Sequence, residues 1–335
     1  MSKIIKNTIY GSEYGRLDPN VLERTKTKSP IKDKEVTRSF EIEEFDLLKI
    51  RSSMGGNNKD LVKGHVREKD IAIPCKDKYL LARLYYPTEL ATFKNCLLYL
   101  HGGGFIGGSI EAMNNQCRLI AERAHTLVVS LNYRLSPESR FPDQYYDAKE
   151  TINWLSINHK DLNILNSQIY VAGDSAGATL AVACGLTDNK HQIRKIISLY
   201  GALDFTSIDK TIYHWQYSDY QICDQEKELI HTRLNKFAIL SKLIQKIYIG
   251  NADDTNPLVN PVYATDFSNF PPLVMIEAEF DYFLQSNKYF AKLARENKIK
   301  VDEVLYKGLD HGFFDRLGIL PQAEDAVNVI VKAME

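Results

Sequence analysis

The chain has 335 residues, of which 44% are hydrophobic and 25% are charged, as expected for a soluble globular protein with one large domain and an added segment. Its net charge of −1 argues against nucleic acid or an anionic membrane as the main partner. The five cysteines are odd in number and no pair has metal-ligand spacing, so we expect reduced thiols in a cytoplasmic protein and no metal site. Lys3 and Lys6 are not followed by an apolar stretch, and no run approaches a membrane span, so we expect neither export nor integral membrane association.

The first 70 residues are richer in charge than the rest of the chain. Residues 40–50 show modest helical periodicity, and the glycines and asparagines at 54–59 indicate a flexible break. The basic residues between 24 and 34 could bind an anionic partner. Acidic residues are interspersed among them, however, so a solvated face or a mobile segment is the favoured interpretation.

From residue 71 onward, segments typical of strands alternate with segments typical of helices. Strands are predicted at 79–86, 95–100, 126–131, 168–172, 195–200, 273–278 and 301–306. Helices are predicted at 111–124, 143–158, 176–186, 284–296 and 322–334. This alternation predicts a mostly parallel sheet that is covered by helices on both faces.

Two glycine-rich motifs directly follow two of the predicted strands. The first is HGGG at 101–104, and the second is GDSAG at 173–177. In a G-x-S-x-G elbow the serine occupies a strained strand-to-helix turn, and the glycines on either side avoid collisions in so tight a bend. No lysine follows the first motif, so an oxyanion-binding turn is favoured over a nucleotide loop or a plain tight turn. Together the motifs predict an acyl-transfer site with Ser175 as the nucleophile.

A serine hydroxyl needs a base and an acid that orients the base, and in α/β-hydrolases the chain order is Ser, Asp or Glu, then His. Of the eight histidines, only His231 and His311 lie well beyond the elbow, in or near the final third of the chain. His231 belongs to the polar, helical stretch 226–237, where a solvated surface role is favoured. His311 lies in a glycine-bracketed loop after the last predicted strand, where the base is expected, and is therefore our candidate.

Three carboxylates are candidates for the acid, because groups at the carboxyl ends of parallel strands gather at one edge of the sheet. Asp281 and Glu279 follow the apolar run 273–278, and Asp204 follows the run 195–200. Asp281 is preferred because it opens a loop, with Asp204 the main rival and Glu279 the last choice. Asp310, next to the histidine, is interpreted as a loop-shaping residue.

The alternation fails between residues 204 and 260. Residues 206–250 are too many for a simple loop, so we expect a helical excursion there. The excursion contains four aromatic residues that could wall an acyl pocket or could pack the excursion against the N-terminal segment: Tyr213, Trp215, Tyr217 and Tyr220.

These motifs, in this order, resemble the hormone-sensitive-lipase-like family of α/β-hydrolase carboxylesterases, which includes bacterial acetyl esterases. The resemblance extends to NYRLSPE at 132–138, RFP at 140–142, the prolines at 271–272 and DHGF at 310–313. It covers the chain from about residue 71 to the C-terminus. It implies a mostly parallel, eight-stranded sheet with helices on both faces and a helical cap. Residues 1–70 would be an N-terminal cap segment, and 71–335 the catalytic domain with a cap insertion at about 205–250.

The resemblance implies Ser175 as nucleophile, His311 as base and Asp281 as the orienting acid. It also implies an oxyanion hole made by three backbone N–H groups, those of Gly103, Gly104 and Ala176. The expected reaction is hydrolysis of a small ester with a short, acetyl-like acyl group through an acyl-serine, without a cofactor. Two alternatives remain open: an amidase or deacetylase that uses the same triad, and a small-molecule receptor on the same scaffold. Relatives often pair through the last strand, so a homodimer is also an expectation.

Overall fold

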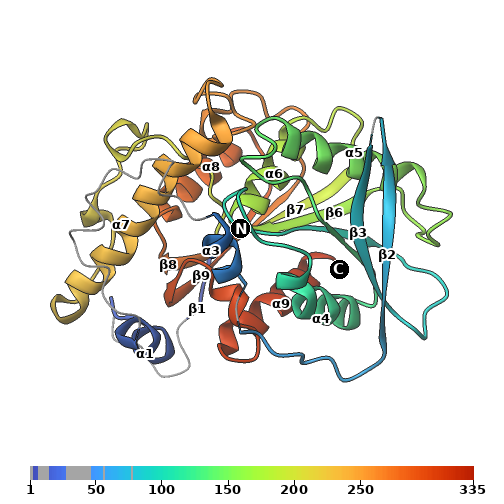
Figure 1. The fold of residues 1–335 in the computed structure, drawn as a ribbon, viewed down its shortest axis with the longest axis horizontal. Helices are drawn as coiled ribbons and strands as arrows, with labels where there is room; N and C mark the ends of the chain where they lie inside the picture. Colours follow the sequence, from blue (N-terminus) through green and yellow to red (C-terminus); the bar gives the residue numbers. More distant parts are fainter. Residues whose placement is uncertain (1–2, 7–14, 28–46, 56, 77) are drawn as a thin grey trace.

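The computed structural model describes residues 3–6, 15–27, 47–55, 57–76 and 78–335 (Figure 1). Nine strands in these ranges form one sheet, in the order β1-β9-β8-β7-β6-β4-β5-β3-β2. Their bounds are β1 Lys3–Lys6, β2 Val66–Cys75, β3 Lys78–Pro87, β4 Cys96–Leu100, β5 Leu127–Leu131, β6 Ile169–Asp174, β7 Ile193–Leu199, β8 Leu273–Phe280 and β9 Val301–Asp310. β3 runs antiparallel to β2 and β5, and the other pairs are parallel, which confirms the expected α/β-hydrolase architecture.

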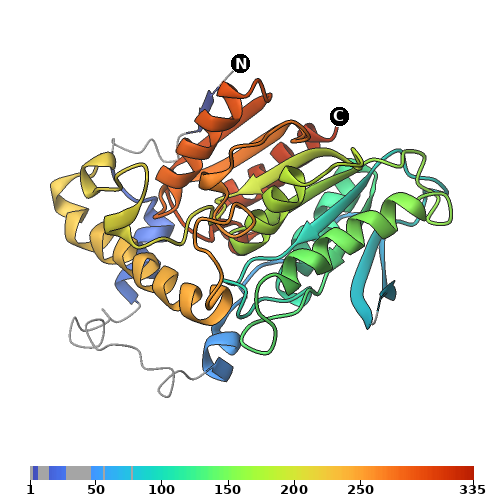
Figure 2. The same ribbon diagram turned by 90° about the horizontal axis from the view of Figure 1, so that it is seen from above.

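The eight longer helices of the described ranges are α1 Pro19–Thr27, α3 Leu47–Ser53, α4 Asn114–Ala124, α5 Asp143–Ile157, α6 Ala176–Leu186, α7 Lys227–Ile244, α8 Leu284–Glu296 and α9 Pro321–Ala333. α4 and α9 contact each other on one face of the sheet, while α5, α6 and α8 cover the other face (Figures 1 and 2). Every residue of β4, β5, β6 and β8 is buried, as expected for parallel strands covered on both sides.

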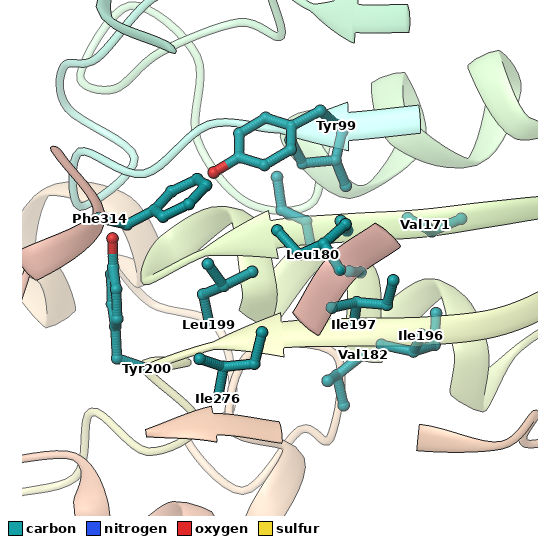
Figure 3. Close-up of a cluster of buried hydrophobic side chains, with 14 of the residues drawn as sticks. Tyr99, Val171, Leu180, Val182, Ile196, Ile197, Leu199, Tyr200, Ile276 and Phe314 are labelled. Atoms are coloured by element: carbon teal, nitrogen blue, oxygen red, sulfur yellow. The ribbon is translucent and has the colours of Figure 1, made fainter. Parts of the chain in front are cut away.

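The core fills both faces of the sheet, and its central part lies between the middle strands and α6. Figure 3 shows side chains from β6, β7, β8 and α6 packed together, with Tyr99, Tyr200 and Phe314 at one end of the cluster. The ring of Phe314 stacks against Tyr99 at a centroid separation of 6.5 Å. Because Phe314 belongs to the loop after β9, this contact ties that loop to the middle of the sheet.

The segment between β7 and β8 leaves the alternating pattern. It contains α7 and several short helical turns: Ile208–Lys210, Tyr217–Asp219, Asp224–Glu226, Gln245–Ile249 and Pro261–Tyr263. α7 lies beside α1 at the end of the molecule opposite β2 and β3 (Figure 1). The predicted periodic stretch 40–50 and the basic stretch 24–34 both fall largely outside the described residues.

β1 accounts for the ninth strand, one more than the eight expected. It pairs in parallel with β9, with Ile4 opposite Val304 and Lys6 opposite Tyr306. The Lys6 ammonium forms an ion pair with Asp325 of α9 and lies over the Tyr306 ring. The N-terminal seventy residues therefore contribute a strand to the sheet, and the expected boundary at residue 70 falls inside β2. None of the helices in the described ranges is long and apolar enough to cross a membrane.

Candidate active site

Ser175 occupies the sharp turn between β6 and α6. Its φ of +52° and ψ of −117° are unusual for a residue with a side chain. The turn is possible because both flanking positions are glycines: a Cβ at Gly177 would lie 2.0 Å from the Leu100 carbonyl oxygen, and one at Gly173 would lie 2.4 Å from the backbone of Gly177. The backbone N–H of Ser175 donates to the Leu199 carbonyl at 2.9 Å, which joins the elbow to the end of β7.

His311 lies in the loop directly after β9, and its imidazole meets both predicted partners. Nε2 is 2.8 Å from the Ser175 hydroxyl oxygen, and Nδ1 is 2.7 Å from Asp281 Oδ2. The His311 side chain is 8% exposed and Asp281 is fully buried, so water is largely excluded from the contact between them. The structure thus brings together three residues that are far apart in the sequence.

The Asp281 carboxylate is fixed by the loop that it opens. Its Oδ1 accepts a hydrogen bond from the backbone N–H of Phe283 at 2.9 Å, which leaves Oδ2 for His311. Its backbone carbonyl accepts from the Tyr220 hydroxyl at 2.8 Å. The carboxylate is therefore held in one orientation by groups on both sides of it.

The other two carboxylate candidates bond elsewhere. Asp204 Oδ1 accepts from the backbone N–H and hydroxyl of Thr206, at 2.9 and 2.8 Å. Glu279 forms a buried ion pair with Lys307 and accepts from the Gly308 N–H at 2.8 Å. The rival histidine, His231, lies on α7 with its ring 4.2 Å from that of Tyr217.

The HGGG segment turns sharply beside Ser175. Gly103 and Gly104 have φ values of +123° and +60°, and the Gly103 carbonyl accepts from the N–H groups of Ile106 and Gly107 at 3.2 and 3.0 Å. Within the part of the chain that the structure describes, the N–H groups of Gly103, Gly104 and Ala176 donate no hydrogen bond. That of Ala176 is also at the N-terminus of α6, where the helix dipole favours negative charge. All three donors are available to a ligand.

Asp174, inside the GDSAG motif, connects the elbow to the HGGG turn. Its Oδ1 accepts from the Gly102 N–H at 2.8 Å and from the Tyr99 hydroxyl at 2.9 Å. A Cβ at Gly102 would lie 2.2 Å from Asp174 Oδ2, so the close approach requires glycine there. Burial raises the pKa of Asp174 to about 7. The sequence motifs alone predict no role for Asp174, although its place beside Ser175 is a signal.

His101 is the histidine of the HGGG motif, and it lies under the turn, away from the triad. Its ring stacks on Tyr133 at 4.3 Å, and its Nδ1 is 2.8 Å from the Gly102 carbonyl oxygen. Burial lowers the pKa of His101 to about 4, so the ring is neutral at physiological pH. It therefore supports the turn as an uncharged group.

Aromatic rings surround the His311 imidazole. The rings of Phe237, Tyr200 and Phe283 lie 4.4, 5.0 and 5.5 Å from it. Phe237 comes from α7, and a Cβ at Gly104 would be 3.2 Å from Ile244 on the same helix. α7 thus covers the site. The sequence offered no motif for Phe237, and its position at the site comes from packing between distant segments.

The four aromatic residues of the excursion mainly pack against other groups. Trp215 Nε1 donates to the Tyr282 carbonyl at 3.1 Å, and Tyr220 donates to the Asp281 carbonyl. Tyr217 faces His231, and the ring of Tyr213 lies 5.9 Å from that of Tyr289 on α8. These contacts are with α7, α8 and the loop after β8 rather than with the N-terminal segment, and two of the four residues brace the loop that carries Asp281.

All five cysteines are free thiols. In the described ranges, no group of three or more His, Cys, Asp or Glu side chains is arranged to hold a metal ion.

Comparison with known proteins identifies the family to which this site geometry corresponds. A family model described as alpha/beta hydrolase fold matches residues 97–315. The chain is 27% identical to an arylesterase of Saccharolobus solfataricus over 270 residues, which is 79% of this chain and 82% of that protein. It is 26% identical to an ethyl acetate hydrolase of Pseudomonas putida over 273 residues, 79% of this chain and 81% of that protein. A solved hyperthermophilic esterase from the archaeon Pyrobaculum calidifontis is similar with a TM-score of 0.76 and 27% identity, covering 95% of this chain and 98% of the other.

Proposed function

The chain belongs to the hormone-sensitive-lipase-like family of α/β-hydrolases, and from that premise we propose that it is a serine carboxylesterase that hydrolyses short-chain acyl esters through an acyl-serine intermediate. One observation carries the proposal: Ser175, His311 and Asp281 form a continuous chain of contacts at 2.8 and 2.7 Å. This is the arrangement that lets a buried carboxylate orient a histidine toward a nucleophilic serine.

In the proposed first half-reaction, the Ser175 oxygen attacks the ester carbonyl carbon while His311 Nε2 takes the hydroxyl proton. Asp281 keeps the Nδ1 proton in place and stabilises the imidazolium without itself taking the proton. His311 then gives its proton to the leaving alcohol, and the acyl group remains on Ser175. In the second half-reaction His311 deprotonates water, which attacks the acyl-serine, and the acid is released as Ser175 regains its proton.

The tetrahedral intermediates carry a negative oxygen, and we propose that the N–H groups of Gly103, Gly104 and Ala176 bind it. The support is that all three donors lie at the turn beside Ser175 without another partner among the described residues. One such donor is typically worth about 10²–10³ in rate, because it is preorganised for charge that develops in the transition state.

A short acyl group is favoured by what surrounds the triad. Phe237 packs on the His311 ring, and Ile244 approaches Gly104, so α7 restricts the volume next to Ser175. The similarity to an ethyl acetate hydrolase points in the same direction. We further propose that α1, α3 and α7 form the cap, and that the chain acts in the cytoplasm, in keeping with its five free thiols.

Replacement of Ser175 by alanine tests the proposal. We expect hydrolysis of p-nitrophenyl acetate to fall by roughly 10⁴–10⁶, as for other triad deletions, with an unchanged circular dichroism spectrum and melting temperature. The matched control is Ser156→Ala on α5, a half-buried serine, which should keep wild-type turnover.

The choice of substrate separates the alternatives. An ester series from acetate to octanoate should show the highest kcat/KM for the shortest acyl groups. Faster release of acetate from an acetylated amine than from the ester would favour a deacetylase. Tight ester binding without release of the alcohol would favour a receptor and would refute the enzyme.

A further inference from the structure

Arg51 on α3 joins three segments that are distant in the sequence. Its Nε donates to the Ile106 carbonyl at 2.7 Å, and its Nη2 donates to the Ser136 carbonyl at 3.0 Å. The same guanidinium pairs with Glu138 through Nη1 and Nη2, at 2.8 and 2.6 Å. A planar fork with five N–H donors can make all of these contacts at once, which a lysine cannot do.

The Ile106 carbonyl belongs to the turn that presents the proposed oxyanion donors. The N–H of Ile106 closes the turn onto the Gly103 carbonyl at 3.2 Å, while the carbonyl of the same residue faces Arg51. The adjacent carbonyl, that of Phe105, accepts from the Ser136 N–H at 2.8 Å. Arg51 and Ser136 therefore hold two successive carbonyls on the outer side of the turn.

α3 and Met54, the residue that follows it, also pack against this turn. A Cβ at Gly107 would lie 2.4 Å from the Met54 sulfur and 3.4 Å from Cγ of Arg51. On its inner side the turn is held by Asp174, through the Gly102 N–H. The turn thus has one anchor in the sheet and a second in α3.

We propose that Arg51 is a positioning residue for the oxyanion hole: by holding the Ile106 carbonyl it keeps the N–H groups of Gly103 and Gly104 aimed at the oxygen of the tetrahedral intermediate. The inference rests on the proposed function. Its physical basis is that donors stabilise a transition state only when they already point to where charge develops, and a misplacement of about 1 Å can cost about 10²-fold in rate.

Glu138 has a supporting role. Its side chain is 60% exposed, and an ion pair so open to water contributes little free energy by itself. Its effect is to hold the guanidinium plane while Nε reaches Ile106. Loss of Glu138 should therefore matter much less than loss of Arg51.

The experiment compares Arg51→Gln, Arg51→Lys and Glu138→Gln with a matched control, Arg123→Gln. Arg123 also bridges two segments, since it bonds Asn328 at 2.8 Å and pairs with Glu324, but it does so between α4 and α9. We expect Arg51→Gln to lower kcat for p-nitrophenyl acetate by about 10- to 100-fold with KM within about threefold. Arg51→Lys should recover part of the loss, and Glu138→Gln and Arg123→Gln should stay within about threefold of wild type.

The inhibition constant of a trifluoromethyl ketone, whose adduct with Ser175 carries the same oxyanion, provides a second measurement. A purely structural role of Arg51 in folding would leave this constant unchanged. Across the Arg51 variants the inhibition constant should rise by the same factor by which kcat/KM falls. A kcat for Arg51→Gln equal to that of Arg123→Gln would overturn the inference, as would ketone binding that stays at the wild-type level while kcat/KM falls. A wild-type protein that cleaves no ester would overturn the proposed function itself, and the inference with it.

Discussion

The replacement of Asp281 by asparagine tests the catalytic assignment most directly. The carboxylate accepts two hydrogen bonds, one from the Phe283 N–H through Oδ1 and one from His311 through Oδ2. Asparagine has the same shape but a single acceptor oxygen. If that oxygen serves Phe283, the side-chain NH₂ faces His311 Nδ1, so the imidazole proton must move to Nε2.

The consequence for the reaction follows from the 2.8 Å contact between His311 and Ser175. An imidazole with its proton on Nε2 donates to the serine oxygen and cannot accept the serine proton. The same change of tautomer in another serine hydrolase lowers kcat by about 10⁴. At about 1.36 kcal/mol per tenfold change in rate, this corresponds to roughly 5 kcal/mol of lost transition-state stabilisation.

The assay is turnover of p-nitrophenyl acetate, with the two rival carboxylates as controls. Asp204→Asn should stay within about threefold of wild type, because an amide oxygen can still accept from Thr206. Glu279→Gln breaks a buried ion pair with Lys307, so it should lower the free energy of unfolding by about 3–5 kcal/mol while kcat is maintained. An Asp281→Asn variant that folds normally and keeps activity within tenfold of wild type would refute the reasoning.

Three further predictions concern the structure around the triad. Gly177→Ala places a Cβ 2.0 Å from the Leu100 carbonyl oxygen, so urea denaturation should show a loss of about 3 kcal/mol or more, and wild-type stability would contradict the clash. Asp310→Asn replaces a buried carboxylate that pairs with two arginines, one of them Arg233 of α7. The free energy of unfolding should fall by about 3–5 kcal/mol in the same assay, and an unchanged midpoint would argue against these ion pairs. Burial and the neighbouring Asp315 carboxylate raise the pKa of Asp174 well above its ordinary value, so the folded state binds this proton more tightly than the unfolded state does. The stability that the bound proton contributes is therefore lost as the pH rises above the ordinary pKa of an aspartate. The melting temperature of Asp174→Asn relative to wild type should therefore be higher at pH 8 than at pH 5, and a difference that does not change with pH would contradict this.

The elements that could be predicted are those with a local cause. The strand that ends at Asp174 and the helix that starts at Ala176 follow from an apolar run and from glycines without which the turn could not close. His311 could be selected because a glycine-bracketed loop follows the last strand. In each case the signal lies within a few residues of the feature.

What could not be predicted depends on contacts between distant segments. Phe237 is one of several apolar residues on α7, and its contact with His311 arises only when the helix packs over the sheet. Arg51 stands in a charged N-terminal region without a motif, yet its guanidinium meets a carbonyl 55 positions later in the chain. Four residues of β1 are too few for a periodic pattern, and their conformation is set by the edge of β9.

The position of β1 has a consequence for self-association. The free edge of a sheet is a template for pairing with another chain, and here the β9 edge is already occupied by residues 3–6 of the same molecule. A second copy that approached from this side would meet the short β1 instead of the β9 edge, and a very short edge strand is a poor template for pairing with another chain.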